Sequence, residues 1–198
     1  MPVIPLFPTI IHGVDIQDFE EVKDNIIEFV YNEQKKDPKG LNLSNEGGWH
    51  SNNEYHFFEN ILKDFITKNV TNYFQSNSDT FSNDFQYKLT GLWMNINGNG
   101  GYNKSHMHPQ SHMSGVCWLQ LPKNSGGIVL QNASYFSCSK EISVYNKNFI
   151  EQMVLHPEYE LFPGSGKMLL FPSSLYHCVQ PNRSNEDRIS ISFNLEFG

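Results

Sequence analysis

The stretch Arg188-Ile189-Ser190-Ile191-Ser192-Phe193-Asn194-Leu195 alternates strictly between polar and apolar side chains. Successive side chains of a β-strand point to opposite faces, so this alternation predicts a half-buried strand. Shorter apolar runs, separated by Gly, Pro and Asn clusters, precede it at 86–96, 114–121, 127–132, 158–162, 167–172 and 175–180. Many short strands after a helical first half favour a mainly β sandwich or barrel, with helices packed on one outer face.

Two helical patterns occupy the first half of the chain. Asp15 is expected to cap the first, because apolar residues then recur at helical spacing. The second pattern begins near Asn53. No internal repeat or linker divides the chain, so we expect one domain over residues 1–198, with 1–84 as a helical support region and 85–198 as the β core. Residues 133–155 lack a clear pattern and are expected to form a long loop or lid.

Composition and charge exclude several classes of protein. The 198 residues are 38% hydrophobic and 14% aromatic, which is enough to bury a core and argues against disorder. The net charge of −7 disfavours a general nucleic-acid binder. No run approaches the roughly 18 apolar residues of a membrane span, and the N-terminus lacks the basic region of a signal peptide. Three cysteines without CxxC spacing fit a reducing compartment, so we expect a cytoplasmic protein.

Three histidines are spaced for metal binding. His106 and His108 stand two residues apart at the start of a strand region, where side chains at i and i+2 share a face, and His177 lies on a later predicted strand. Two known patterns fit less well. A zinc hydrolase of the HxHxDH type requires Asp where Ser111 stands. A cupin requires Glu where His112 stands, and its distal histidine would come earlier than His177.

Arg188 is one of only two arginines and begins the alternating strand, eleven residues after His177. Ser190 follows two residues later on the same face of that strand. The planar guanidinium can bind a carboxylate through two parallel hydrogen bonds, and a serine hydroxyl beside it adds a further donor. The alternative is a surface arginine that pairs with Glu186 or Asp187.

Taken together, these motifs resemble the 2-oxoglutarate- and Fe(II)-dependent oxygenases. The pattern HxD or HxE, a distal His, and RxS about ten residues later appears here as His106-x-His108, His177 and Arg188-x-Ser190. The stretches 114–119, 126–129 and 166–172 are similar to segments of the prolyl-hydroxylase-like members. The chain most resembles a little-characterised microbial and phage subgroup with HxH in place of HxD, which also carries a segment like Ser44-Asn45-Glu46-Gly47-Gly48-Trp49-His50-Ser51.

The resemblance implies a double-stranded β-helix, or jelly-roll barrel, that uses Fe(II), 2-oxoglutarate and O2. It implies that His106, His108 and His177 bind the iron, and that Arg188 and Ser190 bind the distal carboxylate of 2-oxoglutarate. The expected reaction is hydroxylation of a prime substrate, with succinate and CO2 as co-products. The usual ligand set is two histidines and one carboxylate, but residues 100–125 contain no Asp or Glu. Further candidates for the cavity wall are Asn95, Tyr102 and Trp118.

The prime substrate is expected to be a peptide or protein residue or a small metabolite, and the −7 charge makes nucleic acid a poor candidate. Two other functions fit the sequence. One is a three-histidine, cupin-type dioxygenase that needs no 2-oxoglutarate. The other is a β-sandwich module with a structural or binding role and no catalytic activity.

Overall fold

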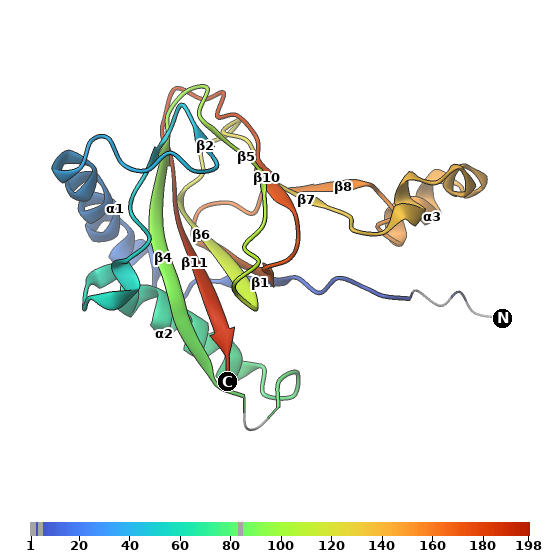
Figure 1. Ribbon diagram of the computed structural model, residues 1–198, viewed down its shortest axis with the longest axis horizontal. Helices are drawn as coiled ribbons and strands as arrows, with labels where there is room; N and C mark the ends of the chain where they lie inside the picture. Colours follow the sequence, from blue (N-terminus) through green and yellow to red (C-terminus); the bar gives the residue numbers. More distant parts are fainter. Residues whose placement is uncertain (1–2, 4–5, 83–84) are drawn as a thin grey trace.

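The computed structural model describes residue 3 and residues 6–82 and 85–198. Two antiparallel sheets face each other and confirm the predicted double-stranded β-helix (Figure 1). The six-stranded sheet has the order β1-β9-β6-β11-β4-β3, and its strands are His12–Asp15, Lys167–Pro172, Met113–Gln120, Arg188–Phe197, Tyr87–Asn97 and Trp49–His50. The five-stranded sheet has the order β2-β5-β10-β7-β8, and its strands are Asn45–Glu46, Tyr102–His106, His177–Val179, Ile128–Gln131 and Glu158–Leu161.

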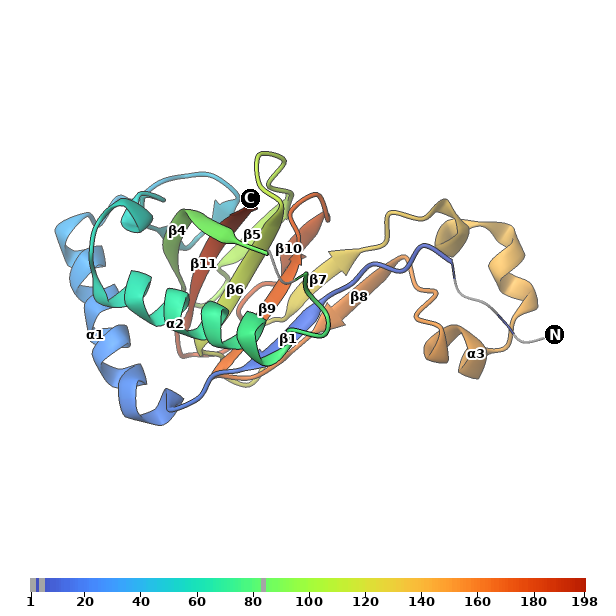
Figure 2. The same cartoon turned by 90° about the horizontal axis from the view of Figure 1, so that it is seen from below.

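Helices α1 (Phe19–Lys36) and α2 (Ile61–Ser76) pack on the outer face of the six-stranded sheet, as predicted (Figure 2). The apolar residues of β11 face these helices: Ile189, Ile191, Phe193 and Leu195 are fully buried. Each such side chain contributes about 1.5–3 kcal/mol relative to an exposed one. Among the described residues, no helix has the length and apolar character needed to cross a membrane.

The starting points of both helices differ from the sequence-based expectation. Asp15 does not cap α1: it ends β1, its carboxylate pairs with Lys167, and Asp18 stands at the N-cap. The second helix begins at Ile61 rather than near Asn53. The side-chain oxygen of Asn60 accepts hydrogen bonds from two backbone N–H groups of the first turn, and this satisfies donors that no helical carbonyl can reach.

The N-terminal region also contributes strands to both sheets. Strand β1 pairs with β9, β2 pairs with β5, and β3 pairs with β4. Residues 1–84 therefore do more than support the barrel from outside, because they complete its edges. The three strands are two to four residues long, and each is stabilised by long-range pairing that a local sequence pattern does not reveal.

Residues 133–155 form short helical turns rather than a structureless loop, including α3 (Lys147–Gln152) and the 3₁₀ segment Lys140–Val144. They lie at the far end of the β7–β8 hairpin, which projects away from the barrel (Figure 2). Within the described part of the chain, none of these residues lines the cavity between the sheets. The expected lid is therefore not positioned over that cavity in this structure.

Candidate metal and cosubstrate site

A cavity of about 510 Å³ lies between the two sheets. Its floor is a row of paired residues that crosses the six-stranded sheet: His50 on β3 lies opposite Asn95 on β4, which lies opposite Ser190 on β11, which lies opposite Trp118 on β6. All four side chains line the cavity. The register of the sheet thus aligns residues of four adjacent strands in one row across the barrel.

The polar face of β11 is the inner wall of this cavity. Arg188, Ser190, Ser192 and Asn194 all line it, while the intervening apolar residues pack against the helices. The strict alternation along this strand thus separates a core face from a ligand-binding face. Arg188 is 1% exposed and Ser190 8% exposed, so the alternative of a surface arginine does not hold.

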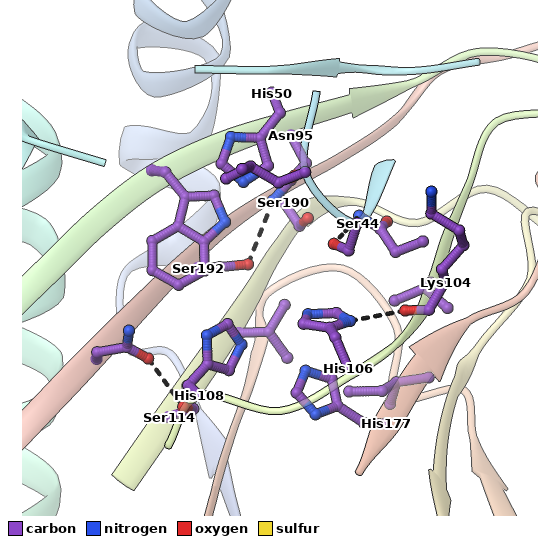
Figure 3. Close-up of a pocket in the computed structure, with 18 of the residues that line it drawn as sticks. Ser44, His50, Asn95, Lys104, His106, His108, Ser114, His177, Ser190 and Ser192 are labelled. Atoms are coloured by element: carbon purple, nitrogen blue, oxygen red, sulfur yellow. Dashed lines mark hydrogen bonds between the residues drawn. The ribbon is translucent and has the colours of Figure 1, made fainter. Parts of the chain in front are cut away.

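His106, His108 and His177 lie together at the cavity wall formed by the other sheet (Figure 3). His106 ends β5 and lies directly opposite His177 on the neighbouring strand β10. His108 lies just beyond the end of β5, where its backbone N–H donates to the carbonyl of Ser173. One potential ligand atom from each ring lies within 4.8 Å of the other two, so the cluster can hold one metal ion.

Backbone hydrogen bonds fix the tautomers of two of these histidines. Nδ1 of His106 lies 2.7 Å from the carbonyl oxygen of Lys104, and Nδ1 of His177 lies 2.9 Å from that of Leu175. A carbonyl oxygen can only accept, so each Nδ1 carries the proton and each Nε2 keeps a free lone pair. A second partner that orients the ring in this way is typical of metal-binding histidines.

Burial keeps the three rings neutral. It lowers the pKa of His177 to about 3 and that of His108 to about 4, with a further lowering by the neighbouring histidines. The pKa of His106 is also lowered by burial. Neutral imidazole is the form that binds a metal ion, so the cluster is ready to bind one without first losing protons at neutral pH.

These shifts predict that the metal-free protein loses stability as the pH falls. The unfolded chain takes up protons near pH 6.5, whereas folded His108 and His177 do so near 4 and 3, so the unfolded state binds more protons in between. Since each pH unit between the folded and the unfolded pKa of one histidine is worth about 1.4 kcal/mol, we expect the free energy of unfolding of chelator-treated protein to drop by on the order of 5–7 kcal/mol between pH 6.5 and pH 3. Denaturant titrations across this pH range measure it. A shallower drop is expected for His177→Gln, and an equal drop in both proteins would contradict the assignment.

Arg188 is a buried cation whose protein partners are all neutral. Its guanidinium donates to the backbone carbonyls of Ser125 and Gln180, the latter at 2.7 Å. It pairs with neither Glu186 nor Asp187, and no carboxylate of the described residues forms an ion pair with it. Burial lowers its pKa to about 10, so it remains charged at neutral pH. A buried charge without a counter-ion is costly, which makes this position suited to an anionic ligand.

The other residues considered from the sequence fall into two groups, those that line the cavity and those that do not. Asn95 and Trp118 line the cavity, as expected for wall residues, but Tyr102 does not. His112 lies away from the cluster, where its Nδ1 accepts from the backbone N–H of Phe197. His50 was assigned no role from the sequence beyond its place in the Ser44–Ser51 segment, and it proves to line the cavity.

Comparison with known proteins decides the family. A family model described as a putative 2OG-Fe(II) oxygenase, where 2OG is 2-oxoglutarate, matches residues 91–194, a span that includes all three clustered histidines and Arg188. The chain belongs to this family. It is therefore an oxidoreductase of the 2-oxoglutarate-dependent oxygenases, which use Fe(II), 2-oxoglutarate and O2. No curated protein matches the chain in sequence.

Solved structures share the fold of this oxygenase at low sequence identity. A prolyl-4-hydroxylase from Pseudomonas putida aligns with a TM-score of 0.62 at 12% identity, over 96% of this chain and 94% of that one. The viral collagen prolyl hydroxylase of Paramecium bursaria Chlorella virus-1, in complex with 2OG, aligns with a TM-score of 0.57 at 14% identity, over 93% and 94%. HygX from Streptomyces hygroscopicus, with nickel, 2-oxoglutarate and hygromycin B bound, aligns with a TM-score of 0.64 at 8% identity, over 95% and 83%.

Proposed function

We propose that His106, His108 and His177 hold the Fe(II) of this oxygenase, and that Arg188 and Ser190 bind the distal carboxylate of 2-oxoglutarate. The observation that carries the proposal is the buried Arg188, which has no acidic partner among the described residues and lines the same cavity as the histidine cluster. A dicarboxylate that spans the cavity would bind the metal ion at one end and Arg188 at the other. Its distal carboxylate would accept hydrogen bonds from the guanidinium and from the Ser190 hydroxyl.

Charge balance supports a dianionic cosubstrate at a three-histidine site. Within the described lining of the cavity there is no Asp or Glu, so nothing in the wall replaces the carboxylate of the usual ligand set. Three neutral imidazoles leave the metal with its full charge, and Arg188 adds another positive charge. The two negative charges of 2-oxoglutarate would offset most of this excess. Its binding is therefore favoured over that of a neutral ligand of the same shape.

When bound, the iron with its cosubstrate supplies the oxygen-activating chemistry, with succinate and CO2 as co-products and hydroxylation of the prime substrate as the outcome. The protein's own residues position and shield the reactants. Arg188 and Ser190 fix the far end of the diacid. Trp118, Val116 and Phe171 supply buried apolar wall around it, which limits water and strengthens the charge pair. Residues 1–198 would act together as one domain, because strands from both halves of the chain complete the barrel.

For the prime substrate, we propose a peptide or protein residue or a small metabolite. Structural likeness to two prolyl hydroxylases supports the first, and likeness to HygX, whose structure contains hygromycin B, supports the second. The net charge of −7 argues against nucleic acid.

Succinate formation in the absence of a prime substrate tests this proposal. Such oxygenases can be assayed for slow conversion of 2-oxoglutarate alone, and here we expect succinate to appear only when both Fe(II) and O2 are supplied. Iron-dependent O2 consumption that ignores 2-oxoglutarate would instead indicate a cosubstrate-independent three-histidine enzyme. Absence of both metal binding and turnover would indicate a binding or structural module.

A further inference from the structure

The segment Ser44–Ser51 crosses from one sheet of the barrel to the other. Strand β2 pairs with β5 of the five-stranded sheet, and β3 pairs with β4 of the six-stranded sheet. Gly47 between them has a φ of +64°, a conformation that favours glycine. Gly48 has no room for a side chain, because a Cβ there would lie 2.3 Å from Nδ2 of Asn97. This segment therefore closes one side of the cavity with a fixed backbone path.

Side-chain hydrogen bonds hold this segment in place. Nδ2 of Asn45 donates to the carbonyls of Leu41 and Gly48, at 3.0 and 2.9 Å. The indole N–H of Trp49 donates to the carbonyl of Asp37 at 2.8 Å, and the hydroxyl of Ser51 accepts from the backbone N–H of Met94 at 2.9 Å. None of these bonds involves the metal cluster. Because they fix Trp49 and Ser51, they also fix the position of His50, which lies between these two residues.

His50 presents a hydrogen-bond acceptor to the cavity. Its Nδ1 lies 2.5 Å from the carbonyl oxygen of Ser51, which can only accept, so the proton is on Nδ1 and Nε2 carries a free lone pair. Nε2 has no hydrogen-bond partner among the described residues. The ring is stacked on that of Trp93 with centroids 5.8 Å apart, and the centroid of the Trp93 ring in turn lies 5.5 Å from that of His108.

A second unused acceptor lies next to it. Asn95 is paired with His50 across the sheet and is 5% exposed. Its Nδ2 donates to the hydroxyl of Ser192, but its Oδ1 is buried without a partner. A buried acceptor left unpaired costs about 1–3 kcal/mol, so this part of the cavity wall is incompletely satisfied within the described residues.

These acceptors do not suit 2-oxoglutarate. Its two carboxylates and its keto group are all acceptors at neutral pH, and Arg188 and Ser190 already offer the donors that match them. Nor do they suit a charged prime substrate. Among the described residues, the cavity wall has no carboxylate to bind a cation, and Lys104, its remaining cationic residue, already pairs with Glu46 at 2.7 Å. A neutral group with an O–H or N–H donor fits best.

We propose that His50 is a specificity-determining residue of the prime-substrate site and accepts a hydrogen bond from a neutral hydroxyl or amide N–H of the substrate. This inference rests on the proposed function, because it assigns the metal and Arg188 to the cosubstrate. It also gives the Ser44–Ser51 segment a role: to hold that acceptor beside the metal cluster.

Nitrogen-15 NMR of histidine-labelled protein, loaded with Zn(II) and 2-oxoglutarate as a diamagnetic complex, tests the proposal directly. We expect Nε2 of His50 to be unprotonated and to shift when acetamide or ethylene glycol is added. Acetate, which has nearly the shape of acetamide but only acceptor atoms, should leave it unchanged. The stronger of the two donor probes indicates whether an amide or a hydroxyl is preferred. A protonated Nε2, no response to either donor probe, or an equal response to acetate would overturn the proposal.

A matched pair of variants tests it once a compound is found that stimulates succinate formation. His50→Gln keeps a side-chain acceptor, whereas His50→Leu removes it at similar size. We expect KM for that compound to rise about tenfold in the leucine variant and to be largely restored in the glutamine variant. Equal KM values in the two variants would overturn the inference. Failure of the wild-type protein to bind 2-oxoglutarate with its metal would instead overturn the proposed function, so the two failures are distinguishable.

Discussion

Replacing His177 with alanine is expected to abolish iron-dependent succinate formation. His177 is 5% exposed and lies directly opposite His106, and the described residues offer no fourth potential ligand in the cluster. Loss of a partner that merely orients a metal ligand costs about 10- to 100-fold in affinity or activity, and loss of the ligand itself should exceed that. Iron content by elemental analysis and succinate yield measure the effect. His106→Ala and His108→Ala should behave alike.

His156→Ala is the matched control, because this histidine lies on the projecting segment and contacts Glu151 rather than the cluster. It should retain both iron and turnover. His108→Asp is a sharper variant, since it restores the carboxylate that other oxygenases carry at this position. We expect it to retain iron. Turnover at wild-type level after the loss of any one of the three histidines would remove that residue from the ligand set.

The second large effect is expected at Arg188. In the Arg188→Gln variant the distal carboxylate of 2-oxoglutarate would lose its charged partner in a buried site. Breaking such a pair costs about 3–5 kcal/mol, which corresponds to a rise of about 150- to 4,000-fold in KM for 2-oxoglutarate. Arg188→Lys keeps the charge but not the planar fork, so it should be impaired to a smaller extent. Steady-state succinate formation at varied 2-oxoglutarate measures both.

The other arginine of the chain supplies the control. Arg183 is exposed and lies outside the cavity, so Arg183→Gln should leave KM for 2-oxoglutarate unchanged. Circular dichroism should show that the Arg188 variants remain folded, since Arg188 also holds two backbone carbonyls. An unchanged KM in folded Arg188→Gln would mean that the cosubstrate binds elsewhere or is not used.

Much of the fold was predictable because its long strands carry their pattern locally. The runs predicted at 86–96 and 114–121 correspond to β4 and β6 within one residue at each end, and the alternating stretch 188–195 lies within β11 and shares its first residue. The short strands β1, β2 and β3 were missed. Their two to four residues carry no recognisable period, and they are held by partners far away in the chain.

The sequence indicated which residues form the site better than it indicated where the fold places them. The spacing of His106 and His108 predicted that both lie on one strand, but only His106 does, and His108 reaches the cluster from the turn that follows. Alternation along β11 predicted a half-buried strand, but it does not by itself distinguish a polar face on the surface from one that lines an internal cavity; the resemblance to the oxygenases supplied that distinction for Arg188 and Ser190. The place of His50 in the wall depends on β3 pairing with β4, which no local pattern signals.

The most direct test of the three-histidine site is an anaerobic titration of the metal-free protein with Fe(II), with and without 2-oxoglutarate, followed by visible absorption. A diacid that chelates iron through its keto and carboxylate oxygens gives a charge-transfer band that neither component shows alone. We predict that this band develops only when both are present and is absent in His177→Ala. Iron binding without the band, or no iron binding at all, would contradict the assignment of this cavity as the iron and 2-oxoglutarate site.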